Sequence, residues 1–166
     1  MKTKLLAAIF FFFTGIYVSS AQQDTRIGVM LNYGTEVEAI GAGANAEFPI
    51  LENLSISPAF IYYFPGDQYG GSLNWWEING NANYYFVNNE NLGFYGLGGL
   101  NYTQVSFDWG DESFGGVESS DGRFGLNLGA GANFNIDSNI TPFAEVKYVI
   151  IDGGQLVLGA GVKFSL

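Results

Sequence analysis

The chain has 166 residues, of which 48% are hydrophobic, 17% aromatic and only 13% charged. It contains no Cys and no His, which excludes disulfides, thiolate catalysis, sulfur-ligated metals and the commonest general base and metal ligand. The formal net charge of −10 makes it a poor candidate for binding nucleic acid, whose phosphates are contacted by Lys and Arg.

The first residues predict export. Lys2 and Lys4 precede an apolar run over residues 5–18, and the small residues Ser19 to Ala21 follow it. This is the charged start, short apolar core and cleavage site of a secretory signal peptide. We therefore expect a signal peptide over residues 1–21, cleaved after Ala21, and one domain over residues 22–166. A membrane-spanning helix is the weaker alternative, because the apolar run is shorter than the roughly 20 residues that such a helix needs.

Apolar residues then alternate with small or polar ones, at the period of two that is typical of β-strands. The expected strands are residues 26–33, 38–48, 54–64, 76–86, 92–104, 123–134, 140–151 and 155–166. Pro58 cannot donate to a strand ladder, so we expect a bulge or a late strand start there. The glycines within residues 92–104 leave the outward face of that strand unassigned.

The predicted fold class is all-β, an eight-stranded antiparallel up-and-down transmembrane β-barrel. Short turns at 49–53, 87–91 and 136–139 alternate with connections at 34–37, 65–72, 105–122 and 152–154. An even number of strands places both termini on the periplasmic side and the second group of connections outside. The alternative is a soluble lipocalin-like barrel, whose outer faces should carry many charges. The polar faces here hold mostly Gly, Asn and Ser.

The final residues, Gly161 to Leu166, resemble the C-terminal signature of bacterial outer-membrane β-barrels: a glycine, then hydrophobic residues at the third-last and last positions. The family's last residue is usually aromatic, and here it is Leu166. The polar residue that usually stands two before the glycine is replaced by Gly159. Residues 22–166 as a whole resemble the small eight-stranded barrels of the OmpA and OmpX type, without the peptidoglycan-binding domain of larger members.

This resemblance implies a place in the outer membrane of a Gram-negative bacterium, in contact with its lipids and lipopolysaccharide. It also implies insertion by the barrel-assembly machinery, which would recognise Gly161, Phe164 and Leu166, and a monomeric state. Aromatic residues near the strand ends are expected to form interfacial girdles. They are Tyr33, Phe48, Tyr62, Phe64, Trp76, Tyr84, Phe86 and Phe134.

Charged residues avoid the outward faces, where Lys or Arg costs about 2–4 kcal/mol at mid-membrane. The inward charged residues are Arg26, Glu47, Glu77, Arg123, Glu145, Lys147 and Lys163. Counting from the strand ends predicts a periplasmic cluster of Arg26, Glu47 and Lys163, and a mid-height group of Glu145 and Lys147. Glu77 and Arg123 are expected nearer the outer end. We interpret this network as structural packing, because eight-stranded barrels are filled by side chains and buried charges must be paired. The alternative is an ion gate or proton path.

The connection at 105–122 is the longest and holds no basic residue. The candidate loop residues are Asp108, Trp109, Asp111, Glu112, Glu118 and Asp121. They could bind divalent cations that bridge to lipopolysaccharide, or a partner surface. We favour a solvated loop tip, because no calcium-loop spacing is present. We expect no metal site and no cofactor.

Catalysis is not expected, because the inward serines lack the His that usually activates a hydroxyl nucleophile. A carboxylate pair such as Glu77 and Glu145 could do acid–base work, but the sequence does not place the two together. The predicted function is that of an integral outer-membrane barrel with a structural or surface-interaction role and a side-chain-filled lumen. A narrow passive pore is the alternative, and a lipocalin-like ligand carrier is less favoured.

Overall fold

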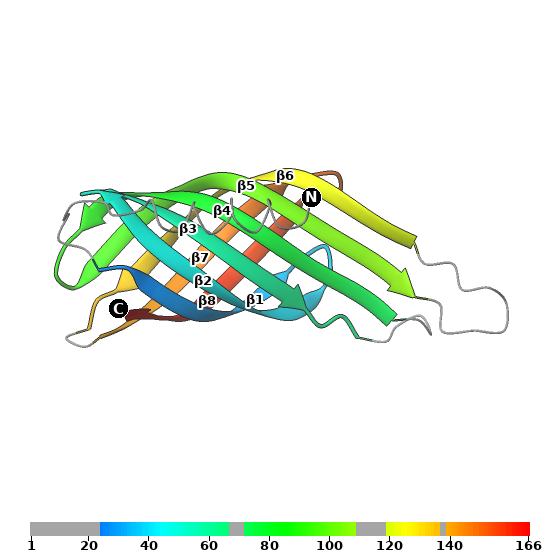
Figure 1. The fold of residues 1–166 in the computed structure, drawn as a ribbon, viewed down its shortest axis with the longest axis horizontal. Helices are drawn as coiled ribbons and strands as arrows, with labels where there is room; N and C mark the ends of the chain where they lie inside the picture. Colours follow the sequence, from blue (N-terminus) through cyan, green and yellow to red (C-terminus); the bar gives the residue numbers. More distant parts are fainter. Residues whose placement is uncertain (1–23, 67–71, 109–118, 137–138) are drawn as a thin grey trace, which may run out of the picture.

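The computed structural model describes residues 24–66, 72–108, 119–136 and 139–166. Over these residues eight antiparallel strands pair in chain order, and β1 also pairs with β8, so the sheet closes into a barrel (Figure 1). The strands are β1 (Arg26–Gly34), β2 (Ala39–Leu51), β3 (Leu54–Tyr63), β4 (Ser72–Asn88), β5 (Leu92–Asp108), β6 (Ser119–Phe134), β7 (Ile140–Ile150) and β8 (Gln155–Ser165). The predicted fold class is confirmed. Among the described residues, no helix is long and apolar enough to cross a membrane. The expected signal peptide lies outside the described residues.

The two ends of the barrel differ. We call the end that holds Leu166 and the connections at 52–53, 89–91 and 135–139 the near end, and the opposite end the far end. At the far end β4, β5 and β6 run beyond their neighbours (Figure 1). The pairing of β6 with β7 begins only at Leu126, although β6 itself begins at Ser119. The barrel therefore carries a three-stranded sheet that projects past its wall.

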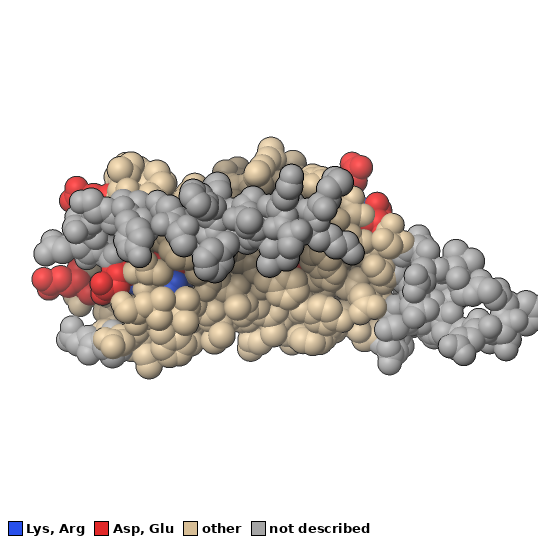
Figure 2. Space-filling model, viewed as in Figure 1, with Lys and Arg blue, Asp and Glu red and all other residues tan. Residues whose placement is uncertain are grey.

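The outward faces of the strands are apolar and the inward faces mostly polar. Leu31 and Phe124 are 63% and 83% exposed on the outer wall, whereas Glu77 is fully buried inside. Figure 2 shows acidic side chains gathered near the two ends of this face, and the part of the wall between them that is not drawn in grey is almost entirely free of charged side chains. This polarity is the inverse of a lipocalin-like barrel and suits a wall in contact with hydrocarbon.

Several strands are longer than predicted. β2 runs on to Leu51, so the turn expected at 49–53 is confined to Glu52 and Asn53. β5 and β6 extend into the expected loop, because residues 105–107 pair with residues 119–121. Outside the membrane a strand does not need an apolar outward face. The alternation of apolar and polar residues therefore ends before the backbone pairing of β5 with β6 ends.

Pro58 causes neither the bulge nor the late strand start that was expected, since β3 begins at Leu54. Pro58 pairs with Gly80 of β4, and the register between β2 and β3 is the same on both sides of it. The register shift between these strands falls instead between Pro49 and Leu51. The unassigned strand is also settled, since β5 buries Tyr95 and Leu97 in the lumen and exposes Leu100 to the outside.

Candidate functional site

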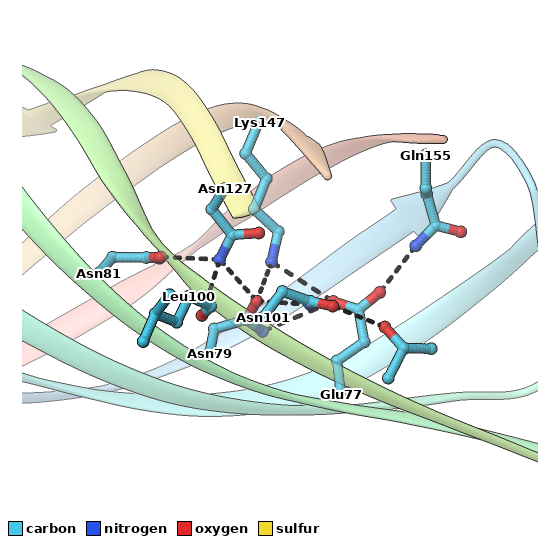
Figure 3. Close-up of polar contacts among 9 residues, drawn as sticks. Glu77, Asn79, Asn81, Leu100, Asn101, Asn127, Lys147 and Gln155 are labelled. Carbon is cyan, nitrogen blue, oxygen red and sulfur yellow. Dashed lines mark hydrogen bonds and ion pairs between the residues drawn. The ribbon is translucent and has the colours of Figure 1, made fainter. Parts of the chain in front are cut away.

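The far half of the lumen is organised around Glu77 of β4. Its Oε1 accepts a hydrogen bond of 2.7 Å from the Gln155 amide of β8, and its Oε2 lies 3.4 Å from the Lys147 ammonium of β7 (Figure 3). The side chains of Glu77 and Lys147 are 0% and 4% exposed. The pair therefore spans the lumen from β4 to β7 and β8, out of contact with water.

Asparagines extend this group. Lys147 Nζ donates to Asn79 Oδ1 at 2.8 Å, and Asn101 and Asn127 each donate to the same oxygen at 2.9 Å (Figure 3). Asn127 also donates to Asn81 Oδ1 at 2.8 Å. A buried amide or ammonium left without partners would be costly. The network supplies partners to the Lys147 ammonium and to the amide groups, apart from the buried Asn127 Oδ1, and by doing so it ties the walls of β4, β5, β6 and β7 together.

The near half of the lumen is organised around Glu47 of β2. Lys163 of β8 lies 2.7 Å from Glu47 Oε2, and Lys163 is 1% exposed. Glu47 Oε1 accepts hydrogen bonds from Ser55 and Tyr85, and Lys163 also donates to Asn133 Oδ1 at 3.0 Å. Both charges are thus buried and each has more than one polar partner, as a buried ion pair requires.

Aromatic rings surround the Lys163 ammonium. Its Nζ lies 4.6 Å from the ring centre of Phe143 and 5.3 Å from that of Tyr95. Such contacts with a desolvated cation are favourable. The Tyr95 hydroxyl in turn donates to Glu145 Oε2 at 3.0 Å. Glu145 is therefore held by a tyrosine rather than by the lysine that was expected to accompany it.

The structure groups the predicted lumen charges differently from the sequence in two places and as predicted in a third. Lys147 pairs with Glu77, not with Glu145. Arg26 lies opposite Glu47 in the β1–β2 register, but its buried Nε has no hydrogen-bond partner within the described part of the chain. Glu47 and Lys163 are the members of the expected near-end cluster that the structure brings into contact.

Arg123 lies at the far rim and not inside the network. Its Nε contacts Asp121 Oδ2 at 2.8 Å, and its guanidinium lies 3.9 Å from Glu36 and donates to the Asp152 carbonyl at 3.1 Å. Burial raises the pKa of Glu36 above its ordinary value, and the Arg123 charge opposes this. Of the predicted loop residues, Asp121 and the Asp108 backbone are described, in β6 and β5. Trp109, Asp111, Glu112 and Glu118 lie outside the described residues.

The amides and tyrosines of the network were missed as site residues. Asn79, Asn81 and Asn83 stand at every second position of β4, on the inward parity. An amide at alternate positions of a strand is the signal that could have marked them, since it places a donor and an acceptor at each level of the lumen.

Apolar side chains complete the filling. One buried cluster consists of Met30, Val37, Ala39, Ile61, Tyr63, Trp75 and Phe143, and a second of Tyr85, Tyr95 and Leu97. Within the described residues no group of three or more acidic side chains is placed to hold a metal ion. The arrangement can hold the walls together and occlude the lumen.

Comparisons with known proteins agree with this geometry. Residues 6–164 match the family model described as outer membrane protein beta-barrel domain. Among solved structures, the N-terminal β-barrel domain of Pseudomonas aeruginosa OprF is 17% identical with a TM-score of 0.70, over 89% of this chain and 100% of that one. Neisserial surface protein A is 16% identical with a TM-score of 0.65, over 86% of this chain and 96% of that one. The attachment invasion locus protein Ail of Yersinia pestis is 23% identical with a TM-score of 0.58, over 85% and 97%. A comparison with curated protein sequences finds no match.

Proposed function

The chain belongs to the outer membrane protein β-barrel domain family, and from this premise we propose a non-conducting barrel with a structural or surface-interaction role. The observation that carries the proposal is the occlusion of the lumen at two levels. Glu77 and Lys147 cross its far half, and Glu47 and Lys163 cross its near half. Each pair is buried from solvent and hydrogen-bonded to neutral side chains. An ion would have to break one buried pair after another to pass.

Single-channel recording tests this proposal. We expect the refolded wild-type barrel in a planar bilayer to give no steady conductance steps. The Lys147→Ala variant, which loses the ammonium of the far pair, should stay closed because Glu47 and Lys163 still occlude the near half. Arg123→Ala at the rim is the matched control, since it removes a cation without touching the lumen. Regular steps from the wild type would favour the narrow passive pore instead.

The orientation of the barrel in the membrane can be proposed from the lengths of its connections. We propose that the near end faces the periplasm and the far end the exterior, because short turns at one end and longer connections at the other are typical of such barrels. The projecting part of β4, β5 and β6 would then stand outside the membrane. Residues 119–125 of β6 pair there with β5 but lie beyond the pairing with β7. An open strand edge of this kind supports a surface-interaction role.

The far rim is acidic, which limits the partners that it suits. Glu36, Asp121 and Asp152 face a single described cation there, Arg123. Ail has been solved in complex with the heparin analogue sucrose octasulfate, but this rim is a poor match for a polyanion. We therefore expect immobilised heparin not to retain the refolded barrel. Retention that falls with rising salt would contradict this.

We also propose three other partners, which are outer-membrane lipids, lipopolysaccharide and the barrel-assembly machinery. Phe164, on the outer face of β8, is 39% exposed, and Leu166, directly after β8, is 73% exposed, which supports their recognition during assembly. We propose no catalytic activity. Glu77 and Glu145 have different partners, and Ser55 is fully buried and donates its hydroxyl to Glu47.

A further inference from the structure

The far part of β6 has a backbone edge that lacks a partner strand. Residues 119–125 pair with β5 on one side, whereas the pairing of β6 with β7 begins only at Leu126, which lies opposite Ile150. In an antiparallel sheet, alternate residues of a strand direct their N–H and C=O groups to the same neighbour. About half of the backbone groups in this stretch therefore face a side where the described part of the chain supplies no strand.

This edge lacks the features by which natural proteins protect exposed strands. Common protective features are proline, a bulge and charged side chains, especially those of Lys. Residues 119–125 contain no Pro and no Lys, and their register with β5 has no shift. Their two charged side chains, Asp121 and Arg123, have opposite signs and contact each other at 2.8 Å, so they do not repel every incoming strand. The edge can therefore accept an added strand, which is a recurring way in which proteins bind extended peptides.

A hollow of about 550 Å³ lies beside the edge. Its lining residues are Arg123 and Phe124 of β6 and Ile150, Ile151 and Asp152 at the end of β7. It exists because β7 ends at Ile150, while β6 extends beyond that level (Figure 1). Arg123 and Phe124 are consecutive, so their side chains point to opposite faces of β6. The hollow, which we call the notch, therefore runs along the edge of the strand and offers the space that an added strand would occupy.

Acidic side chains outnumber cations around the notch. Asp121 and Glu36 lie 2.8 Å and 3.9 Å from Arg123, the one described cation of the far rim. Asp152 lines the notch itself. Three carboxylates and one guanidinium leave two negative charges unbalanced. Opposite charges on paired strands stabilise a sheet and like charges destabilise it, so a strand that pairs with this edge should carry cations.

We propose that residues 119–125 of β6 bind an extended, basic segment of a partner protein by strand addition, with Lys or Arg at every second position of that segment. Hydrogen bonds to the backbone of the edge would provide affinity. The spacing of the cations follows from the pleat of the strand, in which consecutive side chains point to opposite faces. Asp121 lies with Arg123 on the inward face of β6. The outward face, at Gly122 and Phe124, is uncharged.

This inference rests on the proposed surface-interaction role and deepens it by naming the chemical class of the partner. A second copy of the chain is a poorer occupant of the edge, because it would bring the same excess of acidic side chains. The net charge of the whole chain is −10, which also favours association with cationic partners over association with itself. The edge does not depend on whether the lumen conducts.

Fluorescence anisotropy of labelled peptides tests the proposal on the folded barrel in phosphatidylcholine nanodiscs, whose lipids carry no net charge. The probe is a peptide of alternating threonine and lysine, about nine residues long, which is the length of an ordinary strand. We expect saturable binding to the wild type, and no binding of the matching peptide of threonine and glutamate. A threonine and lysine peptide with N-methylated backbone amides keeps its charges but cannot donate hydrogen bonds to the edge. It should bind about tenfold more weakly or not at all.

Variants of the barrel locate the site. Asp121→Lys places a cation on the edge and should weaken binding of the threonine and lysine peptide about tenfold, because like charges would then face each other. Glu90→Lys, in an exposed near-end connection, makes the same change of net charge away from the edge. It is the matched control and should bind as the wild type does. Gel mobility before and after heating shows that each variant is folded. If Asp121→Lys does not fold, Asp152→Asn in the notch should also weaken binding.

Four results would overturn the proposal. They are no binding by the wild type, equal binding of the N-methylated peptide, equal loss in the Asp121→Lys and Glu90→Lys variants, and a wild-type dimer in detergent that Asp121→Lys separates into monomers. The last result would identify a second copy as the occupant. Both faces of a nanodisc are open to solvent, so the binding measurement does not depend on the orientation of the barrel. Its failure and a failure of the proposed orientation or of the closed lumen are therefore distinguishable.

Discussion

Glu47 and Lys163 illustrate how a single buried contact can support the whole near half of the lumen. Their side chains are 4% and 1% exposed, so neither charge can be solvated if its partner is removed. Breaking a buried pair by removing one partner costs about 3–5 kcal/mol. We expect Lys163→Met to lower the free energy of unfolding by that amount, measured by urea titration of the barrel in phospholipid vesicles.

The control for this experiment is Arg123→Gln at the rim. The Arg123 and Asp121 side chains are 34% and 62% exposed, and exposed pairs contribute about 0–1 kcal/mol. The double change Glu47→Gln with Lys163→Met should recover part of the loss, because it leaves no uncompensated charge. A loss below that of Arg123→Gln would show that the near-half pair is not a supporting contact.

The lumen charges also show what residue-level reasoning can and cannot reach. Inward parity follows from period two alone, and counting from the strand ends placed Glu47 and Lys163 together at one end, on the two strands that flank β1. Depth does not follow from parity. Glu77 was expected in a group apart from Lys147, whereas the two side chains lie 3.4 Å apart in the far half of the lumen, and β4 begins at Ser72 rather than at residue 76. Glu145 was misassigned because the glycines of β5 concealed that Tyr95 faces it.

Glycines in these strands differ in role according to the face on which they lie. A Cβ added to Gly129, on the inward face of β6, would collide with the Val146 carbonyl oxygen and the Lys147 backbone. A Cβ added to Gly80, on the outward face of β4, would meet no atom within 4 Å. Close approach of two backbones therefore requires glycine at the first position but not at the second.

We expect Gly129→Ala to lower the free energy of unfolding by about 1–3 kcal/mol through overpacking. Gly80→Ala should be neutral or should stabilise by about 0.4–1 kcal/mol, because alanine restricts the unfolded chain. Urea titration of the two variants in the same vesicles measures both. Equal effects would mean that the wall at β6–β7 can spread to accept a methyl group.

Strands could be recognised from the sequence wherever one face is apolar. The alternation of β1, with Ile27, Val29 and Leu31 outward, arises because hydrocarbon contacts each second residue. The ends of β5 and β6 could not be recognised in this way. Their residues beyond Gln104 and before Arg123 are mostly Ser, Asp and Gly, and they pair with one another outside the apolar band.

At the scale of the whole molecule, the barrel combines an apolar wall, a polar filled lumen and two unlike ends. The wall and lumen follow from one physical requirement, since backbone polar groups within hydrocarbon must be paired internally and polar side chains are turned away from the lipid. The ends are not bound by that requirement. The projecting sheet and the acidic rim therefore mark the part of the molecule that is free to vary with its surroundings.

Orientation in the membrane is the property of the whole molecule on which the surface role depends. The chain has no native Cys, so a single introduced thiol is the only one that a maleimide can label. Asp152 and Glu90 are exposed residues of far-end and near-end connections. We expect a membrane-impermeant maleimide to label Asp152→Cys on intact cells, and Glu90→Cys only after the outer membrane is permeabilised. The unaltered chain should stay unlabelled in both conditions. Labelling of Glu90→Cys alone on intact cells would show that the barrel has the opposite orientation, in which case the projecting sheet would face a periplasmic partner.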